Sequence, residues 1–166
     1  VLRDFMLAYR LHDGGDAWRF YGELKNSGGF TPPNLLSLEL QALASADRWQ
    51  DIVSHPRLPS LLGGRIPLRL VRVLLRALGQ LGLNRLLITE AIGEERRDEL
   101  ADLCRPLSPL FMTVPLFECH ESFKQDWQLW VAGAVTLKCA QIQQQLPGFI
   151  DSDWFRRLLH WADLVA

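Results

Sequence analysis

The chain has 166 residues, of which 48% are hydrophobic and 22% are charged, with 18 basic against 19 acidic side chains. It contains 32 Leu but only 8 Val, 6 Ile and 4 Thr. Leucine favours helices and β-branched residues favour strands, so this composition argues against an all-β fold. The length suits a single domain, 1–166, with a sizeable core. The net charge of −1 excludes a whole-protein attraction to nucleic acid or anionic lipid.

The first half of the chain predicts helices separated by short turns. Glycine can adopt the left-handed conformation that ends a helix, so the glycines of 12–15 are expected to end the first one. Asp16, Thr31 and Asp47 are of the residue types that cap helix N-termini, and each precedes a helical apolar pattern. The elements expected here are, in chain order, a helix ending near Leu11, a helix over 17–25 with Trp18, Tyr21 and Leu24 on one face, a helix over 35–44, a short helix from Arg48, a loop over 55–64, and a helix over 67–81.

The second half continues the helical pattern with more proline. No alternation of apolar and polar residues lasts long enough to predict a sheet. The expected elements are helices over 83–92 and 94–104, an irregular segment over 106–115, a long helix over 123–146 ended by Pro147 and Gly148, and a last helix capped by Asp151 or Ser152. Short links make neighbouring helices antiparallel. We therefore predict an all-α fold of stacked antiparallel helical hairpins, with an αα-solenoid-like arrangement.

Both ends of the sequence suggest a fragment of a larger multi-domain protein, which we expect to be bacterial. There is no initiator Met, and the segments 1–7 and 158–165 have helical apolar patterns without a stop signal. No signal peptide is visible, and no apolar run reaches the roughly 20 residues that a membrane-spanning helix needs. Three widely spaced cysteines fit a reducing compartment better than a disulfide framework. We expect a cytoplasmic location and no membrane contact.

The segment 16–53 has turn residues at positions typical of a helical repeat. Over 44–53, small residues are followed by Asp, a large residue and an apolar residue, and Asp47 lies 31 residues after Asp16. Glycines and paired prolines separate the two helices of the segment. This pattern resembles tetratricopeptide repeats, and its Gly and Pro punctuation resembles the pentatricopeptide variant, with 66–92 as a further degenerate unit. The resemblance implies a degenerate TPR-like domain of stacked helical hairpins.

The densest cluster of reactive side chains is Cys119, His120 and Glu121, and an enzyme built around them is one hypothesis. Neighbours in sequence act as nucleophile and base only if they also meet in space beside an orienting group, so we expect no catalytic residue here. Cys104 and Cys139 lie too far away for the two-to-four-residue ligand spacing of structural zinc sites. The glycine pairs lack the spacing and strand context of phosphate-binding loops. We expect neither a metal nor a cofactor.

A stripe of arginines is the candidate binding feature. Arg65, Arg69, Arg72 and Arg76 recur at i, i+4, i+7 and i+11, which places them on one face of the helix expected from Pro67. The other positions are mainly Leu, Val and Ala, which indicates a helix buried on several sides. Guanidinium groups bind carboxylates or phosphates through two hydrogen bonds. The alternative is a solvated or internally paired face, and the candidate internal partners are Glu90, Glu94, Glu95, Asp98, Glu99 and Asp102.

The sequence therefore favours a non-enzymatic scaffold or protein–protein interaction module. We expect the arginine stripe to contact a protein partner or a neighbouring domain of the same chain. The alternative is a nucleic-acid-binding helical module that uses the same stripe. The salt dependence of binding distinguishes the two hypotheses. The affinity for nucleic acid falls steeply as the salt concentration rises, whereas the affinity of a hydrophobic protein interface does not.

Overall fold

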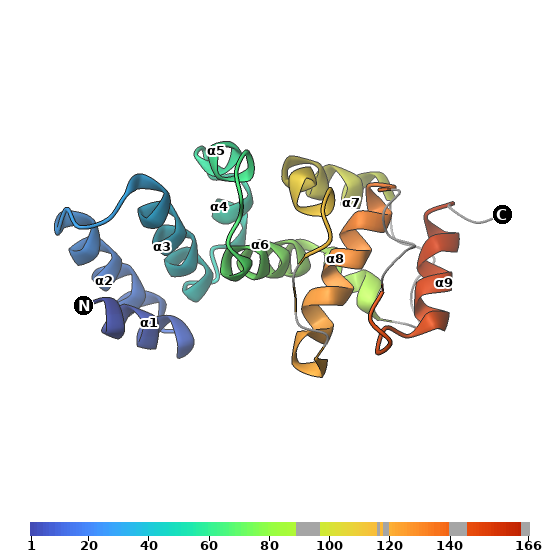
Figure 1. Ribbon diagram of the computed structural model, residues 1–166, viewed down its shortest axis with the longest axis horizontal. Helices are drawn as coiled ribbons and strands as arrows, with labels where there is room; N and C mark the ends of the chain where they lie inside the picture. Colours follow the sequence, from blue (N-terminus) through green and yellow to red (C-terminus); the bar gives the residue numbers. More distant parts are fainter. Residues whose placement is uncertain (89–96, 116, 118–119, 140–145, 164–166) are drawn as a thin grey trace. The chain divides into compact units, whose positions relative to one another are not determined.

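The computed structural model describes residues 1–88, 97–115, 117, 120–139 and 146–163. Within these residues, all the regular secondary structure is helical (Figure 1). No strand occurs within these ranges, so the all-α prediction is confirmed. None of the helices in the same ranges has the length and apolar character needed to cross a membrane. The chain divides into two compact units, Val1–Ala77 and Leu78–Ala166, which are described separately below.

The first unit is built on three helices that contact one another (Figure 1). Its buried core comes mainly from their apolar faces, with α4 packed against α3. The core cluster consists of Phe5, Ala8, Ala17, Tyr21, Leu24, Leu38 and Ala42. The helices, in chain order, are α1 (Leu2–Arg10), α2 (Gly14–Asn26), α3 (Pro32–Ser45), α4 (Trp49–Val53), α5 (Leu58–Leu62) and α6 (Leu68–Leu81), of which α6 belongs to the unit as far as Ala77.

The ends of α1 and α3 differ from the prediction, because residues other than glycine adopt the left-handed conformation there. His12 follows α1 with φ 55°, and Asp47 follows α3 with φ 54°. The N-cap of α2 is Asp13 and not Asp16, since the Asp13 carboxylate accepts a hydrogen bond from the Asp16 backbone N–H at 2.9 Å. The predicted capping role of Asp47 is likewise wrong, because Arg48 occupies the N-cap of α4.

Proline and a close helix contact explain two further differences. The segment 55–64, predicted as a loop, contains α5, and Pro59 fits in its first turn, where a missing N–H does no harm. Gly14, predicted to lie in a turn, is the first residue of α2 and lies against the end of α3. A Cβ at Gly14 would lie 2.7 Å from the Ala46 Cα and 2.8 Å from the Ala46 Cβ. Glycine is therefore required here by the approach of the two chain segments.

Replacing this glycine tests the contact. Gly14→Ala is expected to destabilise the first unit by about 1–3 kcal/mol, because the added methyl group forces the two segments apart. Gly22→Ala is the matched control in the same helix, since nothing lies within 4 Å of its Cβ position. That control should be stabilising by about 0.5–1 kcal/mol through helix propensity. Urea unfolding followed by circular dichroism measures both, and equal stabilisation by the two variants would contradict the close contact.

The second unit is organised around α8 (Lys124–Thr136). This helix contacts most of the unit's other elements, and nearly all of its side chains from Asp126 to Thr136 are buried (Figure 1). The Trp130 indole N–H donates to the Leu110 carbonyl at 2.9 Å. The other elements are the 3-10 helices η1 (Leu83–Leu87), η2 (Arg105–Phe111) and η3 (Glu121–Phe123), and the α-helices α7 (Arg97–Cys104) and α9 (Ser152–Trp161).

Several predicted boundaries in this unit require correction. The long helix expected over 123–146 ends at Thr136, because Lys138 takes φ 55° and the Cys139 N–H bonds back to the Ala134 carbonyl at 2.9 Å. Within the segment expected as a helix over 83–92, the described part is the 3-10 helix η1. The predictions over 89–96 and 140–145 fall outside the described residues. Asp151 caps α9 as predicted, accepting from the Trp154 N–H at 2.7 Å.

The side chain of Trp154 fixes α9 to η1. It is fully buried, and its indole N–H donates to the Leu86 carbonyl at 2.7 Å. Trp154→Phe leaves that buried carbonyl without its donor, so we expect a loss of about 1–3 kcal/mol in the free energy of unfolding. Trp18→Phe, the same substitution at a side chain that is 40% exposed, serves as the control and should change stability little. Equal losses in the two variants, measured by chemical denaturation, would contradict the anchoring role.

Candidate functional site

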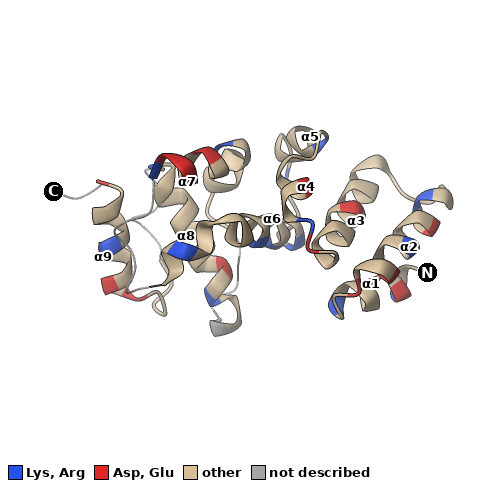
Figure 2. Cartoon of the chain, turned by 180° about the vertical axis from the view of Figure 1, so that it is seen from behind, with Lys and Arg blue, Asp and Glu red and all other residues tan. Residues whose placement is uncertain are grey.

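The predicted arginine stripe lies at α6 and the segment before it, and we call Arg65, Arg69, Arg72 and Arg76 the arginine row. Figure 2 shows basic residues recurring along α6. Arg69 and Arg76 are exposed, whereas Arg72 is half-buried. Arg65 is also exposed, but its predicted place on the helix face is wrong, because α6 begins at Leu68 and Arg65 lies in the non-helical segment before it. The helix therefore fixes the spacing of three of the four arginines.

The remaining surface of α6 within the first unit is largely apolar and buried. Leu70, Val73, Leu74 and Leu75 are at most 1% exposed. Leu68 and Val71, the predicted apolar stripe beside the arginines, are half-buried. The prediction of a helix buried on several sides, with a narrow polar ridge, is thus confirmed. An arginine on that ridge has its Cα fixed by the packed helix while its guanidinium group reaches solvent.

The exposed arginines of the row are not neutralised by ion pairs with other described residues. Arg65, Arg69 and Arg76 have no ion pair with any residue in these ranges, whereas Arg72 has an interaction within the protein. Among the acidic residues expected as internal partners, Asp102 instead pairs with Arg105. The candidates Glu90, Glu94 and Glu95 lie outside the described residues, and Asp98 and Glu99 lie on α7.

Charge is distributed unevenly between the two units. The first unit carries ten Lys and Arg against seven Asp and Glu, and the second carries eight against twelve. Their formal charges are therefore +3 and −4, which together give the net charge of −1. The arginine row lies in the positive unit, where it contributes four of the ten cations. The near-neutral total therefore conceals an excess of positive charge in the first unit.

The two cysteines that the structure describes, Cys104 and Cys139, lie in surroundings that oppose a nucleophilic role. Cys104 is buried, and burial raises the pKa of its thiol to about 12, which opposes formation of the reactive thiolate. Burial also raises the pKa of the Cys139 thiol. His120 is exposed, and its Nδ1 lies 2.8 Å from the Ser122 hydroxyl oxygen. Cys119 and the side chain of Glu121 fall outside what the structure describes, so the hypothesis of an enzyme built around Cys119, His120 and Glu121 is not tested by it.

Metal ligands were not expected from the sequence, and the described residues contain no group of three or more His, Cys, Asp or Glu side chains that could hold a metal ion.

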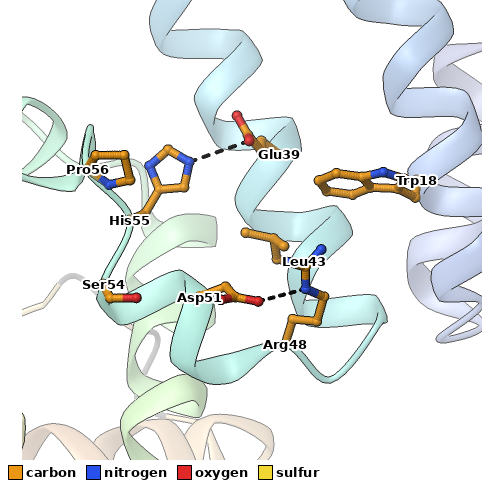
Figure 3. Close-up of a pocket in the computed structure, with 8 residues that line it drawn as sticks. All are labelled: Trp18, Glu39, Leu43, Arg48, Asp51, Ser54, His55 and Pro56. Carbon is orange, nitrogen blue, oxygen red and sulfur yellow. Dashed lines mark hydrogen bonds and ion pairs between the residues drawn. The ribbon is translucent and has the colours of Figure 1, made fainter.

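Sequence reasoning missed an open cleft in the first unit, which we call the Trp18 cleft (Figure 3). Its volume is about 390 Å³. Side chains from α2, α3, α4 and the segment after α4 surround it, with Trp18 on one side and His55 opposite. The lining residues are Trp18, Glu39, Leu43, Arg48, Asp51, Ser54, His55 and Pro56. The cleft thus combines an aromatic ring, two carboxylates and an imidazole around the buried Leu43.

Tyr21 and His55 contact the two oxygens of the Glu39 carboxylate in the cleft. The buried Tyr21 hydroxyl donates to Glu39 Oε2 at 3.0 Å, and His55 Nε2 lies 3.4 Å from Glu39 Oε1. His55 Nδ1 accepts the Arg57 backbone N–H at 3.2 Å, so the proton of a neutral His55 ring is at Nε2, facing Glu39. The Tyr21 hydrogen bond and the contact with His55 therefore hold this carboxylate from two different elements.

A second polar group lies at the other side of the cleft. Arg48 Nε donates to Asp51 Oδ2 at 2.7 Å (Figure 3). The Arg48 guanidinium carbon lies 5.7 Å from the centroid of the Trp18 ring, and that ring lies 5.4 Å from the Tyr21 ring. Asp51 is therefore paired with a cation of this chain, whereas Glu39 is held by the Tyr21 hydroxyl and the His55 ring.

Little in the sequence pointed to this cleft. Trp18, Tyr21 and Leu24 were predicted on one apolar face, but only Tyr21 and Leu24 are buried, while Trp18 is 40% exposed. Glu39 lies within the leucine-rich α3, and His55 was assigned to a loop. The signal that could have been used is Glu39 itself, since it is a single charged residue inside an otherwise uncharged helix.

The environment of Tyr21 gives a pH test. Burial, and then the hydrogen bond and charge of Glu39, raise the pKa of Tyr21 from 10.0 to about 12, against a smaller opposing effect of the Arg57 charge. Because the folded pKa is raised, this tyrosine stabilises the fold fully below pH 10, and the contribution is lost as the pH rises from 10 to 12.

An ultraviolet titration of tyrosine ionisation measures this directly. The chain has two tyrosines, and one of them should ionise only near pH 12. That late phase should disappear in Tyr21→Phe, whose stability should also fall less steeply than that of the wild type between pH 10 and 12. If Tyr21→Phe leaves the titration curve above pH 11 unchanged, the buried hydrogen bond to Glu39 is not formed.

Comparisons with known proteins give one match. No curated protein and no solved structure matched the chain. The model of a family described as DpdD-like matches residues 1–165. The resemblance to tetratricopeptide and pentatricopeptide repeats is therefore wrong, and it rested on turn punctuation that the structure does not bear out: Asp47 is left-handed, and α4 has five residues. The chain belongs to the DpdD-like family.

Proposed function

We propose that the chain is a non-enzymatic protein–protein interaction module of a larger, bacterial, multi-domain protein, and that the arginine row contacts an acidic surface. That surface belongs to a protein partner or to a neighbouring domain of the same chain. The observation that carries the proposal is the exposure of Arg65, Arg69 and Arg76 beside a largely buried helix, without an ion pair among the described residues.

The geometry of α6 supports recognition of carboxylates. Arg69 and Arg76 are seven residues apart, so their Cα atoms are separated by about 10 Å along the helix axis. Each guanidinium group can bind a carboxylate through two parallel hydrogen bonds. The helix sets the spacing before binding, which lowers the ordering cost of the complex. An acidic helix or strand with carboxylates at a similar spacing would match this surface.

The packing of the first unit suits a scaffold. The links between α1 and α2 and between α2 and α3 are short, which favours antiparallel neighbours, and we propose that these helices form stacked antiparallel hairpins. In such stacks the structural core and the binding surface occupy different faces, so that substitutions on the surface leave the fold intact. The widely spaced cysteines favour a reducing, cytoplasmic compartment for the module.

Nucleic-acid binding is the second candidate, because guanidinium groups also bind phosphates and the first unit is positively charged. The size of the row argues against it as the main function. Four arginines neutralise about four phosphates at most, which predicts weak, salt-sensitive binding. The chain as a whole has a net charge of −1 and adds no attraction of its own. We therefore favour a protein partner.

Charge reversal in the arginine row tests the proposal. The probe is a short, fluorescently labelled Glu-rich peptide, and the readout is fluorescence anisotropy. Reversing Arg69 and Arg76 together to Glu is expected to weaken binding at least about tenfold, since two charge-assisted contacts become repulsive. Arg3 and Arg10 offer a matched control: they are exposed, lie in the same unit on α1, and are also seven residues apart. Reversing that pair should change binding no more than about twofold.

Two outcomes would contradict the proposal. Equal weakening by the two double variants would show that net charge, and not the arginine row, governs binding. Tighter binding of a short DNA duplex than of the peptide at physiological salt, with a steep loss of affinity as salt rises, would replace a protein partner with nucleic acid.

A further inference from the structure

We propose that the Trp18 cleft binds a basic side chain, Lys or Arg, supplied by a partner polypeptide. The proposal concerns a different part of the first unit from the arginine row and does not depend on it. Its starting point is that the cleft places a half-buried carboxylate beside an exposed aromatic ring (Figure 3). Its volume of about 390 Å³ lies near the lower end of the range of small-ligand sites, which suits one long side chain.

The Glu39 carboxylate is the first element of the site. Its side chain is 25% exposed, so it is partly desolvated. The Tyr21 hydroxyl donates to it, and His55 Nε2 lies 3.4 Å from its other oxygen. The Tyr21 hydroxyl is a neutral donor, so it orients the carboxylate without cancelling its charge.

The Trp18 ring is the second element. It is 40% exposed, and the guanidinium group of Arg48 already lies 5.7 Å from its centroid. This intramolecular contact shows that a guanidinium group can lie over this ring while its charge is balanced by a carboxylate, here Asp51. Glu39 and the rest of the Trp18 ring repeat the same combination of carboxylate and aromatic surface for an incoming cation.

The charges around the cleft favour a cation over an anion. Of the charged lining residues, Arg48 and Asp51 neutralise each other, which leaves the charge of Glu39. Arg57, which lies just beyond the lining, is exposed and donates to the Pro32 carbonyl at 3.4 Å. An anion would have to break the Arg48–Asp51 pair or approach Glu39 directly. The buried Leu43 at the back of the cleft gives the aliphatic stem of a Lys or Arg side chain an apolar surface.

Small probes can test this site in the intact chain. N-acetyl-arginine methylamide mimics an arginine within a polypeptide, and the citrulline analogue has nearly the same shape without the charge. The readout is the indole N–H signal of Trp18 in two-dimensional NMR, identified from Trp18→Phe. The arginine probe is expected to shift this signal saturably, with a dissociation constant on the order of 1 mM. The citrulline probe should bind at least about tenfold more weakly.

Two variants test whether the arginine probe binds through the Glu39 carboxylate. Glu39→Gln keeps an acceptor for Tyr21 but removes the charge, and it should weaken binding of the arginine probe about tenfold. Glu23→Gln is the matched control, because Glu23 is exposed on α2 and does not line the cleft. It should leave the affinity unchanged.

Several results would overturn the proposal. These are equal affinity for the arginine and citrulline probes, unchanged affinity in Glu39→Gln, tighter binding of N-acetyl-glutamate methylamide, or no shift of the Trp18 signal with the arginine probe at millimolar concentrations. The comparison of the charged and neutral probes uses the wild-type chain, so it decides the question even if Glu39→Gln does not fold. None of these results bears on the arginine row, which lies outside the lining of the cleft.

Discussion

Burial of the apolar side chains of α6 is the constraint on which the proposed binding surface depends. Leu70, Val73, Leu74 and Leu75 are almost completely removed from solvent, which leaves little of the helix in this region for polar residues. The exposed guanidinium groups therefore follow one ridge. The hydrophobic effect stabilises the helix and, through the helical repeat, also sets the spacing of the charges. The same packing that stabilises the fold thus fixes the surface that we propose for an acidic partner.

The two candidate sites of the first unit have opposite preferences. The arginine row presents cations in a unit with an excess of positive charge, whereas the Trp18 cleft presents a carboxylate that accepts a hydrogen bond from the Tyr21 hydroxyl. A partner with acidic and basic groups in the matching arrangement could engage both. Charge complementarity of this kind contributes more to specificity and association rate than to total affinity. The membership of the DpdD-like family is consistent with either site and assigns neither.

The periodicity of the sequence predicted features that depend on a single helix, such as its bounds and its cap. It did not predict features that depend on contacts between separate segments. The apolar pattern of 67–81 gave α6 to within one residue, and Asp151 was identified as a cap because its carboxylate acts on a residue three positions later. The left-handed ends at His12 and Lys138 were missed, because residues other than glycine take that conformation in only a few per cent of cases and nothing local marks these two. The Trp18 cleft was missed because Glu39 and His55 are brought together by the packing of α3 against the following segment.

The central claim, that the arginine row is the surface for acidic partners, is tested most directly by observing the guanidinium groups themselves. The side-chain Nε–Hε signals of the arginines can be followed by NMR in the wild-type chain while a Glu-rich peptide is added. Arg69 and Arg76 should shift saturably, while Arg3 and Arg10, equally exposed on α1, should stay in place. Shifts of similar size at all four arginines, or shifts confined to Arg3 and Arg10, would contradict the account.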